Sequence, residues 1–436
     1  MTYPMIGGIL SIMSMNIVDT FYIAQLGTQP LAAMSFTMPV VAVLLSLAFG
    51  IGIGASSVIS RAIGAKQHTL VQAYTTNALI IALVIAVFFA LTGYLLMDDL
   101  FSKLGAPVYL MPDIHLFMDI WFLGSFVVVI PMVGNSAIRA AGNTKLPSLV
   151  MLSVAIVNMI LDPILIFGLL GFPELGLRGA AIATVVSYAI ALFIGLYLLI
   201  KKFNFINIQA CYTNFFESWK AILRIAIPAT GTNLIAPLSV AITTWFVAKH
   251  SPEAVAGFGV ASRIESLFLV VIMGLSSIMG PFVGQNWGAK NYSRAFSGID
   301  ISLKFIFFWG LLTTGILWLF SDNLTALFSE DPAVIQSASL YLMILPVSYM
   351  FLGSIMATSS AANGMGNPIP SLIMSFLRLL GLYIPLIYIL LDFMNVSGIY
   401  LAASIANILV GLGALIWYQK MKNKYKNLDT LNNSKN

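Results

Sequence analysis

The chain has 436 residues, of which 59% are hydrophobic and only 8% are charged, and its mean hydropathy is +0.96. Soluble domains carry roughly 25% charged residues, so this composition excludes a water-soluble globule and predicts an integral membrane protein. The net charge of +5 does not indicate nucleic-acid binding, because the basic residues lie at the ends of apolar segments and in the C-terminal tail.

Apolar segments long enough to cross a bilayer recur along the whole chain, since a helix needs about 20 apolar residues to span the hydrocarbon core. Strands are not expected, because an open sheet edge in lipid cannot satisfy its backbone groups. The sequence therefore predicts an all-α membrane protein with twelve transmembrane helices near residues 3–26, 33–61, 75–97, 114–138, 146–170, 178–201, 221–248, 255–285, 300–321, 335–360, 370–391 and 396–419.

The two halves of the chain repeat at an offset of 224 residues, which aligns GIGIGASSVISRAIGAK at 50–66 with GLSSIMGPFVGQNWGAK at 274–290. At the same offset Asp19 falls opposite Thr243, so the first copy alone has an acid there. The repeat predicts two six-helix lobes. The domains expected are an N-terminal lobe at 1–201, a cytoplasmic linker at 202–219, a C-terminal lobe at 220–419 and a cytoplasmic polar tail at 420–436.

Charges between the predicted helices alternate in sign along the chain. The positive-inside rule places the basic connections and both termini in the cytoplasm. Each lobe has an even number of helices, which predicts a pseudo-two-fold axis along the membrane normal, as in transporters. An amphipathic run at 219–227 has a counterpart that would fall mostly before Met1, so we expect a longer natural N-terminus. The single cysteine, Cys211, lies in the linker and excludes an internal disulfide.

Three carboxylates lie well inside predicted helices: Asp19, Asp162 and Glu265. An ionised acid in mid-membrane is energetically costly, so each is a functional candidate. Asp19 and Asp162 both lie about 10–12 Å below the outer surface, given a rise of about 1.5 Å per residue. Thr184 lies at a similar depth, and Asn158 shares a helix face with Asp162. We therefore predict one polar cluster in the first lobe.

Two carboxylates in a poorly solvated pocket cannot both ionise cheaply, so we expect at least one of Asp19 and Asp162 to hold a proton near neutral pH. The cluster predicts a proton or cation switch, with Asn16 as a secondary member. Each acid alone also has a structural interpretation, because an Asp near a helix end can reach the interface or cap a neighbouring helix. Asp162 can also satisfy backbone donors freed by Pro163.

Glu265 and Arg378 are secondary candidates in the second lobe. Glu265 lies about 15 Å from either face of the membrane, and Arg378 lies about 12 Å from the inner face. These similar depths favour a structural ion pair between the two residues. No residues have metal-ligand spacing, and no nucleotide-binding or hydrolase motif is present. We therefore expect no cofactor, no enzymatic activity and no metal site, with Na⁺ at the Asp19 and Asp162 cluster as the one alternative.

Five motifs follow one another along the chain: NIVDTFYIAQLG (16–27), SRAIGAK (60–66), NMILDPILI (158–166), GAAIAT (179–184) and VGQNWGAK (283–290). With these motifs in this order, the sequence resembles the multidrug and toxic-compound extrusion (MATE) family, prokaryotic type, over all but the segment before the first helix. The resemblance implies a V-shaped pair of six-helix lobes around a central cavity. It also implies an antiporter that exports amphipathic, often cationic, organic compounds in exchange for H⁺ or Na⁺.

The resemblance also implies that Asp19, Asn158, Asp162 and Thr184 form the cation-coupling site. Some members use acids on the seventh helix for a sodium site, but the helix at 221–248 has none here. This departure favours coupling in the first lobe by protons, although a cage of carboxylate, amide and hydroxyl oxygens also suits Na⁺.

The sequence leaves two other functions open. The first is a lipid or lipid-linked oligosaccharide flippase of the same superfamily, which should have a strongly basic cavity. The second is a membrane-embedded enzyme, which would need a catalytic motif that the sequence lacks. For the antiporter we expect alternating access, small organic substrates and membrane lipid as partners, a monomer, and location in the plasma (inner) membrane.

Overall fold

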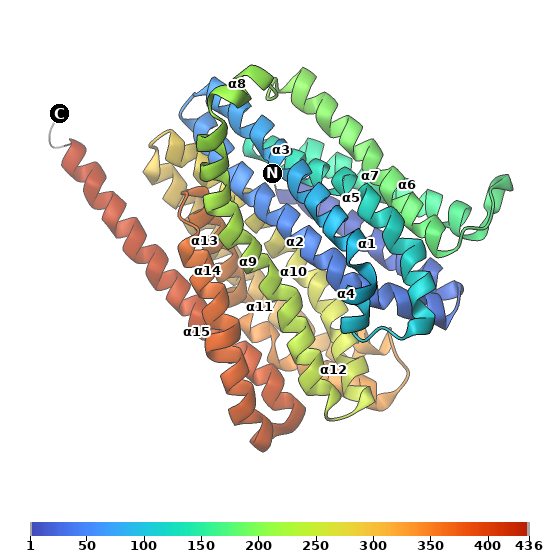
Figure 1. Cartoon of the computed structure of the whole chain (residues 1–436). Coiled ribbons are helices and arrows are strands. Elements are labelled where there is room, and N and C mark those ends of the chain that lie inside the picture. The colour runs from blue at the N-terminus through green and yellow to red at the C-terminus, as the bar shows by residue number, and fades with distance from the viewer. Residues whose placement is uncertain (1, 434–436) are drawn as a thin grey trace. The chain divides into compact units, whose positions relative to one another are not determined.

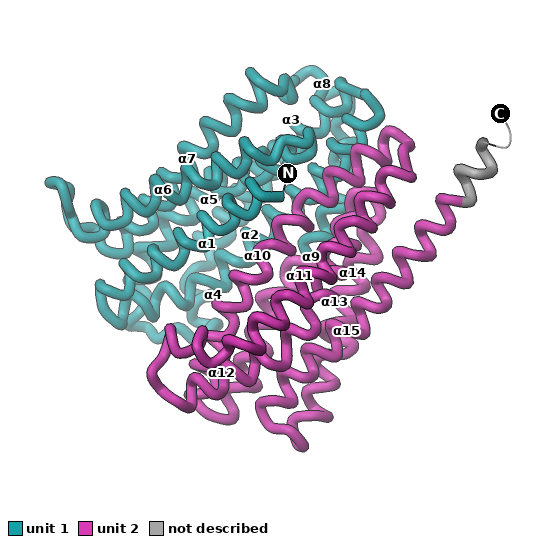
Figure 2. Tube along the Cα trace, turned by 180° about the vertical axis from the view of Figure 1, so that it is seen from behind, with its two compact units in different colours: residues 1–230 teal, residues 231–436 magenta. Residues whose placement is uncertain are grey.

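The computed structural model describes residues 2–433, with side chains for residues 2–426, and this part of the chain is helical with no strand (Figure 1). Figure 2 colours its two compact units, Met1–Thr230 and Gly231–Asn436. The first unit contains α1 (Thr2–Gln25), α2 (Thr28–Gly64), α3 (His68–Leu95), α4 (Met97–Lys103), η1 (Val108–Leu110), α5 (Met111–Ala140), α6 (Lys145–Phe167), η2 (Leu169–Gly171), α7 (Leu177–Tyr197), η3 (Leu198–Lys202), α8 (Ile208–Thr213) and the start of α9 (Phe215–Ala248).

The second unit takes the rest of α9 and the helices that follow it. Their bounds are α10 (Pro252–Gly288), α11 (Tyr292–Ala326), α12 (Pro332–Ile344), η4 (Pro346–Ser348), α13 (Tyr349–Gly364), α14 (Ile369–Phe376), η5 (Leu377–Tyr383) and α15 (Ile384–Asn433). The boundary between the units falls inside α9, not in the polar stretch that we predicted as a linker.

Within the described residues, 11 helical segments are long and apolar enough to cross a membrane. The last of them, Ile369–Lys426, covers both of the final two predicted spans. Asn395 divides it, because its backbone angles of φ 50° and ψ −136° are not helical. The segments therefore agree with the twelve crossings predicted, and the chain is a multi-pass membrane protein.

The backbone itself carries the internal repeat. Left-handed residues recur at the 224-residue offset, at the ends of corresponding helices. Glycine is favoured at such positions because it has no Cβ, and asparagine is tolerated there better than most residues. The pairs are Lys66 (φ 58°) with Lys290 (57°), Gly142 (83°) with Gly366 (84°), and Gly171 (85°) with Asn395 (50°).

Small residues set the close approach of helices in the first unit. A Cβ on Gly54 would lie 2.7 Å from the carbonyl oxygen of Ile222, and one on Gly50 would lie 2.8 Å from the backbone nitrogen of Thr230. In lipid, helices associate by such close packing, since hydrocarbon offers no hydrophobic driving force. Glycine is therefore required where α2 meets the first half of α9.

The predicted linker packs against α3. The Trp219 indole donates to Asn77 Oδ1 at 3.1 Å, and Asn207 Nδ2 donates to Gln72 Oε1 at 3.1 Å. Cys211 lies in α8 and is only 2% exposed. The linker residues are thus part of the first unit.

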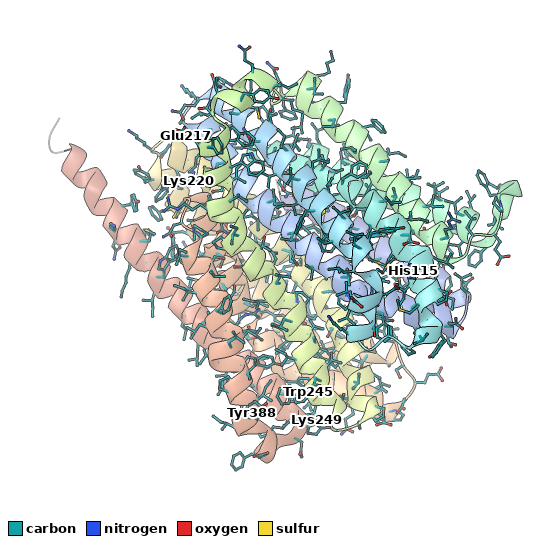
Figure 3. All side chains as sticks on the ribbon, viewed as in Figure 1. His115, Glu217, Lys220, Trp245, Lys249 and Tyr388 are labelled. Carbon is teal, nitrogen blue, oxygen red and sulfur yellow. The ribbon has the colours of Figure 1, made fainter. Side chains whose placement is uncertain are left out.

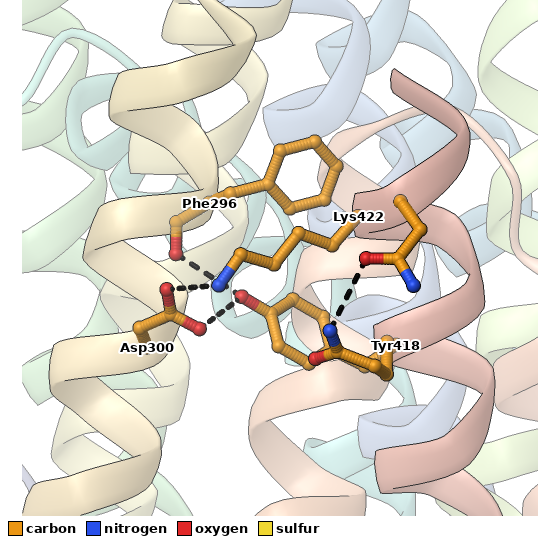
Figure 4. A network of polar contacts seen from close by, with 6 residues as sticks. Phe296, Asp300, Tyr418 and Lys422 are labelled. Atoms are coloured by element: carbon orange, nitrogen blue, oxygen red, sulfur yellow. Dashed lines mark hydrogen bonds and ion pairs between the residues drawn. The ribbon is translucent and has the colours of Figure 1, made fainter. Parts of the chain in front are cut away.

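A polar contact fixes the end of α15 on α11 (Figure 4). Lys422 Nζ forms an ion pair with Asp300 Oδ2 at 2.6 Å, and the Tyr418 hydroxyl donates to Asp300 Oδ1 at 2.6 Å. The described part of α15 continues to Asn433, so the predicted polar tail begins as a helix. Residues 434–436 lie outside the described residues.

Aromatic and basic side chains gather where α9 ends in the second unit (Figure 3). The Lys249 ammonium lies 3.4 Å from the centroid of the Trp245 ring, and Trp245 and Tyr388 line one shallow cavity of about 340 Å³. Both rings are more than half exposed. Tryptophan and tyrosine favour the membrane–water interface, so this end of α9 has the character of an interfacial anchor.

Candidate functional site

The packing of α6 against α1 and α7 brings the predicted first-lobe residues together. Asn158 Nδ2 donates to Asp162 Oδ1 at 3.2 Å and to Thr184 Oγ1 at 3.5 Å. Asn158 and Asp162 are both 0% exposed, and their spacing of four residues places them on one face of α6. Pro163 follows directly and lacks a backbone donor, so it interrupts the hydrogen-bond ladder beside Asp162.

The carboxyl groups of Asp19 and Asp162 contact each other across α1 and α6. Two carboxylates are acceptors only, so a hydrogen bond between them requires one proton on the pair. Asp19 Oδ1 and Asp162 Oδ2 are buried and have no other hydrogen-bond partner among the described residues. None of the ion pairs in this part of the chain involves either acid. The pair therefore has acceptor atoms available for a proton or a small cation.

Asn16 does not join the Asp19 pair. Its side chain is exposed, and its carbonyl oxygen accepts a bond from Thr20 Oγ1 at 2.8 Å, as within an ordinary helix. The four other predicted residues, Asp19, Asn158, Asp162 and Thr184, are brought together. The amide of Asn158 links the last two.

The second unit does not contain the ion pair that we expected. Glu265 Oε2 accepts a hydrogen bond from the Tyr341 hydroxyl, and Arg378 Nη1 donates to Asn407 Oδ1 at 3.2 Å. Within the described residues no direct Glu265–Arg378 pair forms, although the two charges are close enough to interact electrostatically. Tyr341 and Asn407 are nearer partners, so the prediction of a direct pair was wrong.

Thr243, the counterpart of Asp19 in the repeat, has ordinary hydroxyl contacts. It donates to Ser239 O at 2.8 Å and shares a hydrogen bond with the Tyr383 hydroxyl. At the same offset, Asp162 corresponds to Leu386 and Asn158 to Leu382. The second copy therefore lacks all of the ionisable groups of the first-unit cluster at these positions.

Sequence reasoning missed Tyr341, Tyr349 and Asn407, which surround Glu265 and Arg378. Asn407 could have been identified from the sequence, because a polar amide inside an apolar transmembrane span is unusual. The tyrosines gave little signal, since aromatic residues are common in membrane helices.

No group of three or more His, Cys, Asp or Glu side chains that could hold a metal ion occurs among the described residues. The oxygen atoms of Asp19, Asp162 and Thr184 are hard ligands of the kind that Na⁺ prefers. They could hold Na⁺ as a transported ion, in place of a proton.

The MatE family profile matches residues 4–164 and 228–389, one match in each half of the chain. The chain belongs to the MatE family. It is therefore a membrane transporter and not an enzyme, and the two matches follow the same internal repeat that the sequence and the backbone carry.

Similar proteins cover nearly the whole chain. One relative is described as a FAD transporter from Shewanella oneidensis; it is 38% identical over 97% of this chain and 93% of its own length. A probable multidrug resistance protein, YoeA of Bacillus subtilis, is 24% identical over 91% of this chain and 88% of its own length. The crystal structure of the Vibrio cholerae MATE transporter VcmN in the bent form is 32% identical, with a TM-score of 0.92, over 97% of this chain and 96% of that one.

Proposed function

We propose that this MatE-family transporter exports small organic molecules in exchange for protons by alternating access. The proposal rests on the contact between Asp19 and Asp162, two carboxyl groups without a basic partner in the described residues. Such a pair holds one proton readily and gives it up only when another cation or a more polar environment replaces it. Both termini would face the cytoplasm, and the protein would work as a monomer in the plasma (inner) membrane.

The proton changes the interactions of α1. When both acids are ionised, repulsion across α1 and α6 favours a conformation in which the two carboxylates are separated or bind a cationic substrate. When the pair is protonated, a hydrogen bond between the two carboxyl groups holds α1 against α6 and removes the negative charge that a cationic substrate would need. A proton and a cationic substrate therefore compete for the same ionised acids, which couples their movements in opposite directions.

A flavin nucleotide is a second candidate substrate alongside organic cations. The relative described as a FAD transporter is 38% identical to this chain, whereas relatives described as multidrug proteins are 24% and 25% identical. FAD is an amphipathic aromatic molecule like many exported drugs, but it is an anion.

Transport in proteoliposomes tests the proposal. Purified protein is reconstituted with ethidium or FAD, and either a proton gradient or a sodium gradient is imposed. We expect the proton gradient to drive transport, and we expect Asp19→Asn and Asp162→Asn each to abolish it, because asparagine cannot take up a proton. Asp99→Asn is the matched control, since Asp99 is exposed in α4 and remote in sequence from the cluster.

Two results would contradict the proposal. Transport driven by sodium alone would assign the cluster to Na⁺. Undiminished proton-driven transport by either cluster variant would remove the cluster from coupling. Size-exclusion profiles that match the wild type confirm that a loss of transport does not reflect misfolding.

A further inference from the structure

Arg378 is a basic side chain in the second unit that has no role in the proposed coupling mechanism. It lies in η5, a π-helical turn between α14 and α15, and such turns are frequent at functional sites. A guanidinium group has five N–H donors. Only one contact to Arg378 uses them, the 3.2 Å bond to Asn407 Oδ1, so most of its donors have no protein acceptor in the described part of the chain.

The guanidinium is held in position from one side. Asn407, which is 4% exposed, donates through Nδ2 to Ser348 Oγ at 3.0 Å, and Ser348 donates to Leu345 O at 2.8 Å. These bonds connect α15, η4 and η5 through fully or nearly fully buried side chains. Arg378 itself is only partly buried. A cation fixed on one side with free donors on the other is organised to bind an acceptor that is not part of the protein.

The groups around Arg378 do not supply that acceptor. The neighbouring elements carry Glu265 on α10, Tyr349 on α13 and Tyr383 on η5, which interact with it or with its neighbours electrostatically. Glu265 accepts its bond from Tyr341. Because Glu265 does not contact Arg378 directly, no carboxylate among the described residues binds the guanidinium group. A phosphate group can present two oxygens at once, which matches the planar guanidinium fork.

The first copy of the repeat has no polar residue at the positions that correspond to Arg378 and Asn407. In the first copy, Val154 lies opposite Arg378 and is 2% exposed, and Ala183 lies opposite Asn407. The helix that carries the acid Asp162 in one unit therefore corresponds to the segment that carries a cation in the other. Packing alone does not require an arginine there, because the first unit fills the equivalent place with valine.

We propose that Arg378 binds the phosphate group of an amphipathic aromatic phosphate ester, and so sets the charge selectivity of transport from the second unit. The proposal rests on the proposed export function and gives it an anionic substrate class. Asn407 acts as a positioning residue, because its Oδ1 accepts from the guanidinium while its Nδ2 donates to the buried Ser348 hydroxyl.

Substrates that differ only in phosphate content provide the test. Proteoliposomes containing the wild type, Arg378→Gln or Arg378→Lys are supplied with FAD, FMN, riboflavin or ethidium under an imposed proton gradient. We expect Arg378→Gln to lower FAD and FMN transport by about tenfold or more, with riboflavin and ethidium unchanged, because only the first two carry phosphate. Arg378→Lys should retain part of the activity, since it keeps the charge but loses the fork.

Arg263→Gln is the matched control, because Arg263 is an exposed arginine on α10 of the same unit. FAD binding to the purified protein in detergent, followed by flavin fluorescence, gives a readout independent of transport. We expect Arg378→Gln to weaken FAD binding and FMN to compete with FAD. Competition by short-chain phosphatidylglycerol without competition by FMN would assign Arg378 to a lipid headgroup and overturn the proposal.

Three transport results would also overturn it. Equal loss of all four substrates in Arg378→Gln would indicate a structural role, and no loss of any would indicate no role. A wild type that carries ethidium but neither FAD nor FMN would reject the phosphate substrate and leave proton coupling standing. A wild type without proton-driven transport of any substrate would instead reject the proposed function itself.

Discussion

The two units share one helical plan but place charge on it differently. The first has the acids Asp19 and Asp162 in contact, and the second has Thr243 at the position of Asp19 and Arg378 in the segment corresponding to α6. Acids that face each other suit ion exchange, whereas a guanidinium with most of its donors unused suits recognition of an anion. The difference suggests that duplication supplied the fold twice, and that a few buried positions then divided coupling from recognition.

Moving the acid from the first unit to the second tests whether a single acid in either unit is sufficient to couple transport to protons. In Asp19→Asn with Thr243→Asp, we expect driven transport to remain abolished, because an aspartate at 243 would face Tyr383 and not a second carboxyl group. The measurement is proton-driven ethidium transport, with Thr243→Asp alone as the control for folding. Recovered transport in the double variant would show that a single acid in either unit couples.

Removing a hydroxyl from the second-unit network should have a smaller effect. Tyr341→Phe deletes one hydrogen-bond donor to Glu265, which should cost about 1–3 kcal/mol of stability. Thermal unfolding in detergent measures this, and Tyr388→Phe is the control, because Tyr388 is 61% exposed. Equal midpoints for the two variants would mean that the network contributes nothing to holding the second unit together.

The smallest effect concerns the linker, which the structure assigns to the first unit. Burial raises the pKa of the Cys211 thiol above its ordinary value, and a hydrogen bond with Asn77 opposes this only in part. Because the thiolate is the reactive form, we expect maleimide to label Cys211 more slowly in the folded protein than after denaturation, with the difference persisting as the pH rises from about 7 to 9.

An exposed cysteine provides the reference for that measurement. Ser102→Cys in a Cys211→Ser background places a thiol on the exposed side of α4 and should react at the rate of a free thiol. If Cys211 reacted as fast as this reference, the linker would be free and the boundary of the first unit would lie near residue 202, as the sequence predicted.

Much of the architecture could be predicted from the sequence. Apolar length alone indicates the spans, because lipid leaves a helix no alternative way to satisfy its backbone, and the 224-residue repeat indicates the duplication. The first-unit cluster could also be predicted. Depth along the helix follows from residue count, and intramembrane acids are rare enough for a matching pair to be informative.

What the sequence could not decide is which side of each helix faces which neighbour. Helices that are apolar all round have no amphipathic pattern to indicate their packed face, so depth could place Glu265 and Arg378 but not their partners. Tertiary packing therefore decided that Tyr341 binds Glu265, that Asn407 orients Arg378, and that the side chain of Asn16 is exposed while Asp19 meets Asp162. It also decided that the predicted linker packs on α3, because polar side chains there find hydrogen-bond partners that lie far away in sequence.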